Sequence, residues 1–311
     1  MIGGTSTDFH GNFLYPRIRR IFSEKIRLIL GQKKLAWKSV FIPPVMPKPD
    51  VQALTGGYRK TPVLQVGADV YCDTSRIATE LEARWPEPTL FPDGGRGLAL
   101  ALATWGDRFF EPGAGLSMSG NDQLPGDLLQ DRREFFTHMD FSAFAARTPH
   151  MYAQALAHAA LVEDQLADGR PFLSGDRPGL VDATAYYVLW MLRGFIPAMS
   201  TRLEPCRRAA AWEQRVRGIG HGRRREIDAA QALAIARATE PSPASGVDPN
   251  DPSGLQAGQI VTVTPDDYGK VPVAGELVTL DARRVAVRRR DDRAGEVVVH
   301  FPRIGYVVAA A

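Results

Sequence analysis

The sequence predicts three parts in order: an α/β domain over residues 12–86, an all-helical domain over residues 92–238 and a small antiparallel β-domain over residues 255–311. The opening pattern is strand, helix, strand, and from residue 97 apolar residues recur at helical spacing. Beyond residue 254 the apolar period changes to two, which is typical of strands. Residues 239–254 are a predicted linker, because they carry four prolines among Ser, Asp and Gly.

The composition is that of a soluble globular protein, with 44% apolar and 23% charged residues in a chain of 311. A net charge of +3 does not by itself require a nucleic-acid partner. Two cysteines are too few for a disulfide framework and favour a reducing cytoplasm. We expect no membrane partner, because no run approaches the ~20 apolar residues of a span and the first residues lack a signal pattern.

The α/β domain is expected to begin with a strand at residues 12–15, after a disordered stretch over residues 1–11. The apolar stripe of Phe22, Ile26, Ile29 and Leu30 predicts a helix that ends at Gly31. A second strand follows at residues 37–42. A strand–helix–strand unit favours a parallel pair with a right-handed crossover.

The rest of this domain is organised around residues 60–81, which indicate strand, tight turn, strand and helix. Pro62 opens the first of these strands, so a cis Thr61–Pro62 bond would turn the Thr61 backbone outward toward an extended peptide. Asp73 and Thr74 begin the helix, where an amino-acid carboxylate would meet the helix end and its ammonium would meet Asp73. The alternative interpretation is an ordinary hairpin followed by a capped helix.

The second domain is predicted to hold several helices joined by loops. A loop or irregular lid is expected at residues 111–126, which are rich in Gly, Ser and Pro. The predicted helices span residues 97–110, 128–147, 152–168, 183–192, 207–216 and 225–238.

The third domain is predicted to be a barrel or sandwich of about five strands. Alternating Val residues around a hairpin loop at residues 291–295 indicate one buried face. The sequence does not disclose a partner for this domain. The predicted strands are residues 260–264, 276–280, 284–290, 296–301 and 306–309.

Two motifs together resemble the glutathione S-transferase family. Thr61-Pro62-Val63-Leu64 followed by Cys72-Asp73-Thr74-x-x-Ile77 is similar to that family's glutathione-binding core. Residues 22–28 resemble its first helix. The resemblance covers roughly residues 12–235 and implies a thioredoxin-like domain followed by an all-helical one. The β-domain is not part of the usual architecture of this family.

The resemblance implies a transferase that adds the thiolate of glutathione, its co-substrate, to a small apolar electrophile, and a homodimer. It implies that Asp73 and Thr74 hold the γ-glutamyl end of glutathione, that the Thr61 backbone, before Pro62, pairs with the cysteinyl backbone, and that Lys60 holds the glycyl carboxylate. Lys60 also has the interpretation of a solvated loop residue. Gly179 and Asp182 resemble the capping motif of a buried family helix, with a role in folding.

The sequence departs from the family where a Ser, Cys or Tyr usually stabilises the thiolate. Alignment places Arg20 and Ile21 where the common bacterial form has Ser or Cys followed by Pro. Ser23, Arg20 and Tyr15 are therefore three candidate catalytic residues, although Arg20 does not deprotonate and would act only through its charge. The departure supports an alternative function, a non-catalytic protein that binds glutathione or a partner on the same scaffold.

Other reactive residue types give weaker signals. Cys72 is expected to be a buried structural thiol rather than a nucleophile, because no His lies at a telling spacing. The six His residues are scattered, so we predict no metal site.

Overall fold

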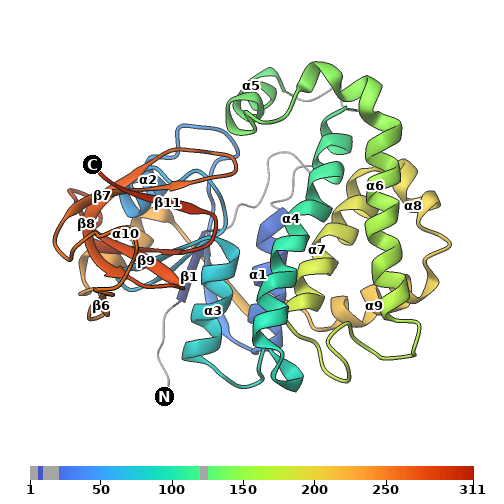
Figure 1. Ribbon diagram of the computed structural model, residues 1–311, viewed down its shortest axis with the longest axis horizontal. Helices are drawn as coiled ribbons and strands as arrows, with labels where there is room; N and C mark the ends of the chain where they lie inside the picture. Colours follow the sequence, from blue (N-terminus) through green and yellow to red (C-terminus); the bar gives the residue numbers. More distant parts are fainter. Residues whose placement is uncertain (1–5, 10–20, 120–124) are drawn as a thin grey trace.

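The computed structural model describes residues 6–9, 21–119 and 125–311. Its strands and helices follow one another in three groups, the last of which is all strands (Figure 1). The helices are α1 (Ile21–Gln32), α2 (Pro49–Thr55), α3 (Thr74–Arg84), α4 (Arg96–Ser119), α5 (Gly126–Phe135), α6 (Phe144–Gln165), α7 (Leu180–Phe195), α8 (Pro197–Arg202), α9 (Arg207–Gly218) and α10 (Ala229–Arg237). The strands are β1 (Ser6–Phe9), β2 (Ala36–Val40), β3 (Val63–Val66), β4 (Asp69–Cys72), β5 (Arg223–Ile227), β6 (Gly246–Val247), β7 (Ile260–Pro265), β8 (Val273–Leu280), β9 (Arg284–Asp291), β10 (Gly295–Pro302) and β11 (Tyr306–Ala310).

One sheet runs through the first and third domains. Its strand order is β11-β7-β8-β9-β10-β4-β3-β1-β2-β5, with β6 paired to β8. The segment β4-β3-β1-β2 is the thioredoxin-like sheet, in which β1 and β2 are parallel. On one edge β10 pairs in parallel with β4, and on the other β5 pairs in parallel with β2. Both edges of the thioredoxin-like sheet are therefore covered by later parts of the chain.

The C-terminal strands share a hydrophobic core with the thioredoxin-like domain. Leu54, Val63 and Val70 from the N-terminal part pack in one buried cluster with Val299 and Phe301 from β10. The expected β-domain is present, with strands that begin and end within a few residues of the predicted bounds. Its sheet is continuous with that of the first domain, and in Figure 1 the orange and red strands lie beside α2 and α10.

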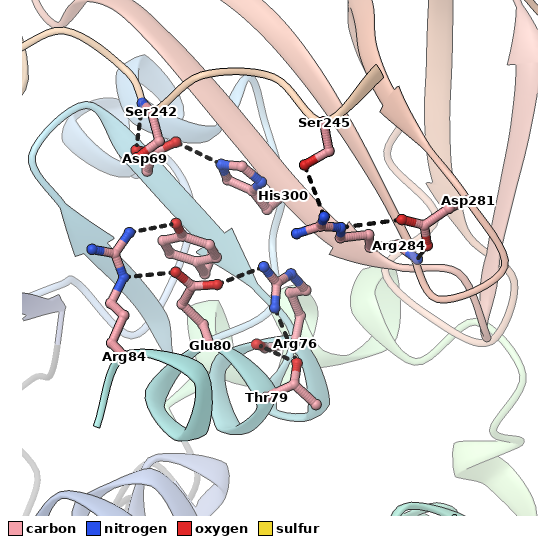
Figure 2. A network of polar contacts seen from close by, with 11 residues as sticks. Asp69, Arg76, Thr79, Glu80, Arg84, Ser242, Ser245, Asp281, Arg284 and His300 are labelled. Carbon is pink, nitrogen blue, oxygen red and sulfur yellow. Dashed lines mark hydrogen bonds and ion pairs between the residues drawn. The ribbon is translucent and has the colours of Figure 1, made fainter. Parts of the chain in front are cut away.

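Asp69 at the start of β4 joins the linker and β10 to the first domain (Figure 2). His300 Nε2 donates to Asp69 Oδ1 at 2.7 Å, and the Ser242 backbone N–H donates to Asp69 Oδ2 at 2.9 Å. Burial alone would raise the pKa of Asp69, but these hydrogen bonds lower it. Burial lowers the pKa of His300 despite the carboxylate beside it. The ring of Tyr71 stacks on His300 with centroids 4.5 Å apart. We call these contacts of Asp69, His300 and Tyr71 the joint between the C-terminal strands and the first domain.

The helical domain is built around α7, most of whose residues are buried. Helices α1, α4 and α9 contact it. The approach of α4 is close at Gly106, where a Cβ would lie 2.4 Å from Thr184 Cγ2, so glycine is required there. The predicted capping box is confirmed, since the Gly179 backbone N–H donates to Asp182 Oδ2 at 2.9 Å. No helix in the described part of the chain is long and apolar enough to cross a membrane.

The start of the chain differs from the prediction. The strand expected at residues 12–15 lies outside the described residues. The strand that pairs with β2 is instead Ser6–Phe9. Residues 6–9 are therefore ordered, whereas the sequence predicted disorder for residues 1–11. Backbone pairing with both β2 and β3 fixes this segment in the sheet.

Three helix predictions are also wrong in their bounds. The loop expected at 111–126 is helical as far as Ser119, with Pro112 inside α4. The helix expected at 128–147 is broken, because Asp140 caps a new turn by accepting from the Ser142 backbone N–H at 3.0 Å. The helix expected from residue 225 begins at Ala229, because residues 223–227 pair with β2.

Candidate glutathione-binding cleft

The turn from β4 into α3 places a carboxylate at a helix entrance. Asp73 is the N-cap of α3, and its Oδ1 accepts from the Ser75 backbone N–H and from Ser75 Oγ, each at 2.8 Å. Asp73 has φ of +76° and ψ of 138°, which lies outside the left-handed helical region and is strained for a residue other than glycine. The Thr61–Pro62 bond that opens β3 is cis, as proposed from the sequence. The two motifs quoted from the sequence therefore meet at β3, β4 and the start of α3.

A buried lysine from α1 lies at the same helix entrance. Lys25 is 3% exposed, and its Nζ donates to Thr74 Oγ1 at 3.3 Å. Burial lowers the pKa of Lys25, and the carboxylates of Asp107 and Asp73 oppose that shift. An ammonium group next to the first turn of α3 adds to the positive end of the helix dipole. The arrangement suits a ligand that carries both a carboxylate and an ammonium group.

The C-terminal strands contribute a hydroxyl to Asp73. Tyr306, the first residue of β11, donates to Asp73 Oδ2 at 3.1 Å. Its hydroxyl also lies 2.9 Å from that of Tyr58. Burial, followed by the charge of Asp73, raises the pKa of both tyrosines, so they stay protonated at neutral pH. Sequence analysis missed Tyr306 because a single Tyr in a predicted strand carries no signal of where the strand docks.

Lys60 is already paired in the structure. Its Nζ donates to both carboxylate oxygens of Asp267, at 2.5 and 2.7 Å. The Tyr268 ring lies under the same ammonium, with Nζ 4.2 Å from the ring centroid. Asp267 and Tyr268 belong to the loop between β7 and β8, so the interpretation of Lys60 as a solvated loop residue is wrong. No feature of the sequence around Asp267 indicates this contact.

Asp107 on α4 lies close enough to Lys25 and Asp73 for their charges to act on its carboxyl. Burial in the cleft raises its pKa to about 6, with the positive charge of Lys25 opposing the shift and the negative charge of Asp73 adding to it. Asp107 is itself exposed at the surface, so the loss of water around its carboxyl is only partial. The charges of Lys60 and Asp267 act on it as well. Three aspartates and two lysines from five parts of the chain therefore share one cleft.

Comparisons with known proteins identify the family of the chain. Residues 21–89 match the family described as glutathione S-transferase, N-terminal domain, and residues 75–215 match the one described as glutathione S-transferase, C-terminal domain. A GST-like protein from Pseudomonas syringae of known crystal structure is 34% identical, with 99% of this chain and 100% of that chain covered and a TM-score of 0.80. The chain belongs to the glutathione S-transferase family.

Two other transferases share the fold at low identity. The Tau class enzyme from mango, Mangifera indica, is 17% identical over 68% of this chain and 88% of that one, with a TM-score of 0.51. A glutathione transferase from Burkholderia graminis is 14% identical over 70% of this chain and 88% of that one, with a TM-score of 0.52. That structure holds two glutathione molecules per subunit. No curated protein matches the sequence.

The position of the usual glutathione S-transferase nucleophile is only partly described. Tyr15 and Arg20 lie outside the described residues. Ser23 is fully buried, and its Oγ has no hydrogen-bond partner in the described part of the chain. Ser23 and Lys25 leave α1 on nearly opposite sides, because successive helical residues are ~100° apart. Since Lys25 reaches Thr74, this geometry directs Ser23 away from the α3 entrance and favours a packing role.

Cys72 precedes Asp73 in the sequence, but its surroundings do not make it a reactive thiol. Cys72 is fully buried and unpaired, and burial followed by the charge of Asp73 raises its pKa well above the usual range. An inert structural thiol fits these facts. Among the described residues no group of three or more His, Cys, Asp or Glu could hold a metal ion.

A separate cavity of about 500 Å³ lies between α4 and α6. Trp105, Arg108, Arg147 and His158 are among the residues that line it, and the lining includes exposed, half-buried and buried residues. Neither Asp73 nor Lys60 lines this cavity, but the cavity adjoins the surroundings of Lys60, because its lining residue His138 stacks on Tyr268 with ring centroids 5.7 Å apart.

Proposed function

We propose that the protein binds glutathione in the cleft at Asp73 and uses its thiolate on a small apolar electrophile. The observation that carries the proposal is the Asp73 carboxylate at the entrance of α3, beside the buried ammonium of Lys25. An α-amino acid group carries the two complementary charges, an ammonium for Asp73 and a carboxylate for Lys25 and the helix entrance. The glutathione that the Burkholderia graminis transferase holds supports the choice of ligand.

Each part of glutathione has a proposed partner. The γ-glutamyl ammonium meets Asp73, and the γ-glutamyl carboxylate meets the first turn of α3 at Thr74, near Lys25. The cysteinyl backbone pairs with the backbone of Thr61 before the cis Pro62. The glycyl carboxylate approaches Lys60, where it meets the existing Lys60–Asp267 pair.

The chemistry requires the thiol of glutathione to ionise. A free thiol has a pKa of ~8.5, so a neighbouring donor or cation must favour the thiolate at neutral pH. Ser23, Arg20 and Tyr15 remain the proposed candidates, with Ser23 weakened by its burial away from Thr74. The thiolate then attacks the electrophilic carbon, and the leaving group departs with the bonding electron pair. A homodimer stays a prediction from the family resemblance, and a cytoplasmic location stays a prediction from the two cysteines.

Calorimetry with glutathione tests the binding proposal. The Asp73→Asn variant keeps a good N-cap but removes the charge, so glutathione binding is expected to weaken by at least ~10-fold. The matched control is Asp228→Asn, which makes the same change at the N-cap of α10. Equal affinities of wild type and Asp73→Asn would rule out the proposed γ-glutamyl contact.

The alternative function is a non-catalytic glutathione-binding protein. Two features favour it. Arg20 and Ile21 occupy the usual nucleophile positions, and the Ser23 side chain is buried and directed away from the α3 entrance. Turnover of an activated aryl halide with glutathione distinguishes the transferase from the non-catalytic binding protein. Turnover that Arg20→Ala or Tyr15→Phe abolishes supports the enzyme, whereas binding without turnover over a panel of electrophiles supports the alternative.

A further inference from the structure

The Lys60–Asp267 pair places a carboxylate of the protein where the proposed function requires one from the ligand. Both oxygens of Asp267 accept from Lys60 Nζ. The Lys60 side chain is 13% exposed, so it is largely enclosed, whereas the Asp267 side chain is 46% exposed. A carboxylate arriving from solvent would therefore find the best donor directions of Lys60 in use and the negative charge of Asp267 beside them.

The position of Asp267 is fixed by the loop that carries it. The Gly269 backbone N–H donates to the Phe135 carbonyl at 3.0 Å, which ties the loop between β7 and β8 to α5. Gly269 has φ of +61°, and a Cβ there would lie 2.5 Å from Phe135 Cε2. The ring of Tyr268 packs against Phe135 and Phe136, with centroids 5.2 and 5.0 Å apart. An anchored loop presents the Asp267 carboxylate to Lys60 without further ordering, and such preorganisation strengthens a contact.

The charge balance of the cleft opposes another anion. Asp73, Asp107 and Asp267 together carry more formal charge than Lys25 and Lys60 supply. A free glycyl carboxylate would add one more negative charge next to Asp267. An ester or amide at the same end of the ligand adds no charge and leaves the Lys60–Asp267 pair intact.

We propose that Asp267 is an internal carboxylate ligand of Lys60 and determines specificity at this end of the cleft. It favours γ-glutamyl thiol peptides whose Lys60 end is an ester, an amide or another uncharged group over peptides with a free carboxylate there. The proposal rests on the proposed function, because it uses the orientation of glutathione set by Asp73. To bind, glutathione itself must either displace Asp267 from Lys60 or place its glycyl carboxylate beside Asp267 despite the repulsion between the two carboxylates.

Calorimetry with two probes, glutathione and its glycyl monoethyl ester, tests this proposal on the full-length protein. The wild type is expected to bind the ester at least ~3-fold more tightly than glutathione. The isosteric Asp267→Asn variant is expected to bind glutathione ~5–10-fold more tightly than the wild type does, since one charge-assisted contact is removed, and to bind the ester within twofold of the wild type. Asp266→Asn is the matched control, because it removes the same charge one residue away from the pair.

The outcomes separate this inference from the proposed function. Weaker glutathione binding by Asp267→Asn overturns the inference, because Asp267 would then position Lys60 for the ligand rather than replace the ligand. A preference between glutathione and ester that is equal in all three proteins also overturns it. Either result, combined with lost glutathione binding in Asp73→Asn, leaves the proposed function standing. Failure of both the wild type and Asp267→Asn to bind either probe overturns both.

Discussion

Asp107 is the residue through which the cleft responds to pH. Its pKa of about 6, raised first by burial, means that the carboxylate is charged above pH 6 and neutral below it. Protonation removes one negative charge near Lys25 and Lys60 and makes the cleft more favourable for an anionic ligand. We expect the affinity for glutathione to rise ~3-fold as the pH falls from 7.5 to 5. Calorimetry across this range measures the slope.

The Asp107→Asn variant is the control for that prediction. It removes the charge at every pH, so it is expected to bind glutathione about as tightly at pH 7.5 as the wild type does at pH 5. The same pH dependence in the variant and the wild type would assign it to another group in the cleft.

Residues of the cleft differ in how well the sequence predicts them. Asp73, Thr74 and Pro62 lie within about a dozen residues of one another, so turn and capping rules suffice to bring them together. Asp107, Asp267 and Tyr306 reach the same place from three distant elements. Their approach depends on how the C-terminal strands and α4 dock, and no local pattern encodes it. Lys25 stands inside a quoted motif, but its contact with Thr74 depends on the packing of α1.

The N-terminus of α7 depends on one buried carboxylate. Asp182 is 1% exposed and accepts from the backbone N–H groups of Leu173, Ser174 and Gly179 and from Trp212 Nε1. Asp182→Ala would leave these buried donors unpaired, at ~1–3 kcal/mol for each that water cannot reach. We expect the free energy of unfolding to fall by ~4 kcal/mol, measured by urea denaturation.

The capping box of α10 supplies the comparison for α7. Asp228 makes the same box with Gln231, but Asp228 itself is exposed to solvent. Asp228→Ala is expected to cost only ~1 kcal/mol, because water replaces the lost acceptor. Equal losses in the two variants would mean that burial of Asp182 does not matter.

Helices and strands with strongly periodic apolar residues could be predicted from the sequence. Strands that form only because they pair with a neighbouring strand could not. Alternating Val residues predicted the strands from residue 260 onward. In the structure, burial alternates along β7, whereas β8, β9 and β10 each bury a run of three or four consecutive residues. By contrast, β5 is Arg223–Ile227, with four exposed residues and no alternation. It forms because β2 offers a free edge in register, a property of the folded sheet rather than of the segment.

At the scale of the whole molecule, the joint between Asp69 and His300 holds the C-terminal strands on the first domain. Burial lowers the pKa of His300 below its usual ~6.5. Just below pH 6.5 the His300 ring is therefore protonated more readily in the unfolded chain than in the folded protein. Stability contributed by neutral His300 is therefore lost as the pH falls below ~6.5. His300→Phe keeps a ring on Tyr71 but removes the donor to Asp69.

We expect His300→Phe to lower the free energy of unfolding by ~2 kcal/mol at pH 7.5, because Asp69 is buried and loses a charged hydrogen bond. The difference from the wild type is expected to shrink between pH 7 and pH 5. Urea denaturation at a series of pH values measures both. A constant difference would show that His300 does not titrate between the folded and unfolded states in this range.

Continuity of the sheet makes the C-terminal strands part of the first domain's core rather than an appendage. Without residues 240–311, the edge of β4 would be unpaired and Leu54, Val63 and Val70 would lose their cover. We therefore expect a chain that ends at Thr239 to aggregate or bind a hydrophobic dye, measured by size-exclusion chromatography and dye fluorescence. A truncated chain that elutes as one folded species and still binds glutathione would show the opposite. The helices and the four N-terminal strands would then be self-sufficient, and Tyr306 and Asp267 would modify a cleft that forms without them.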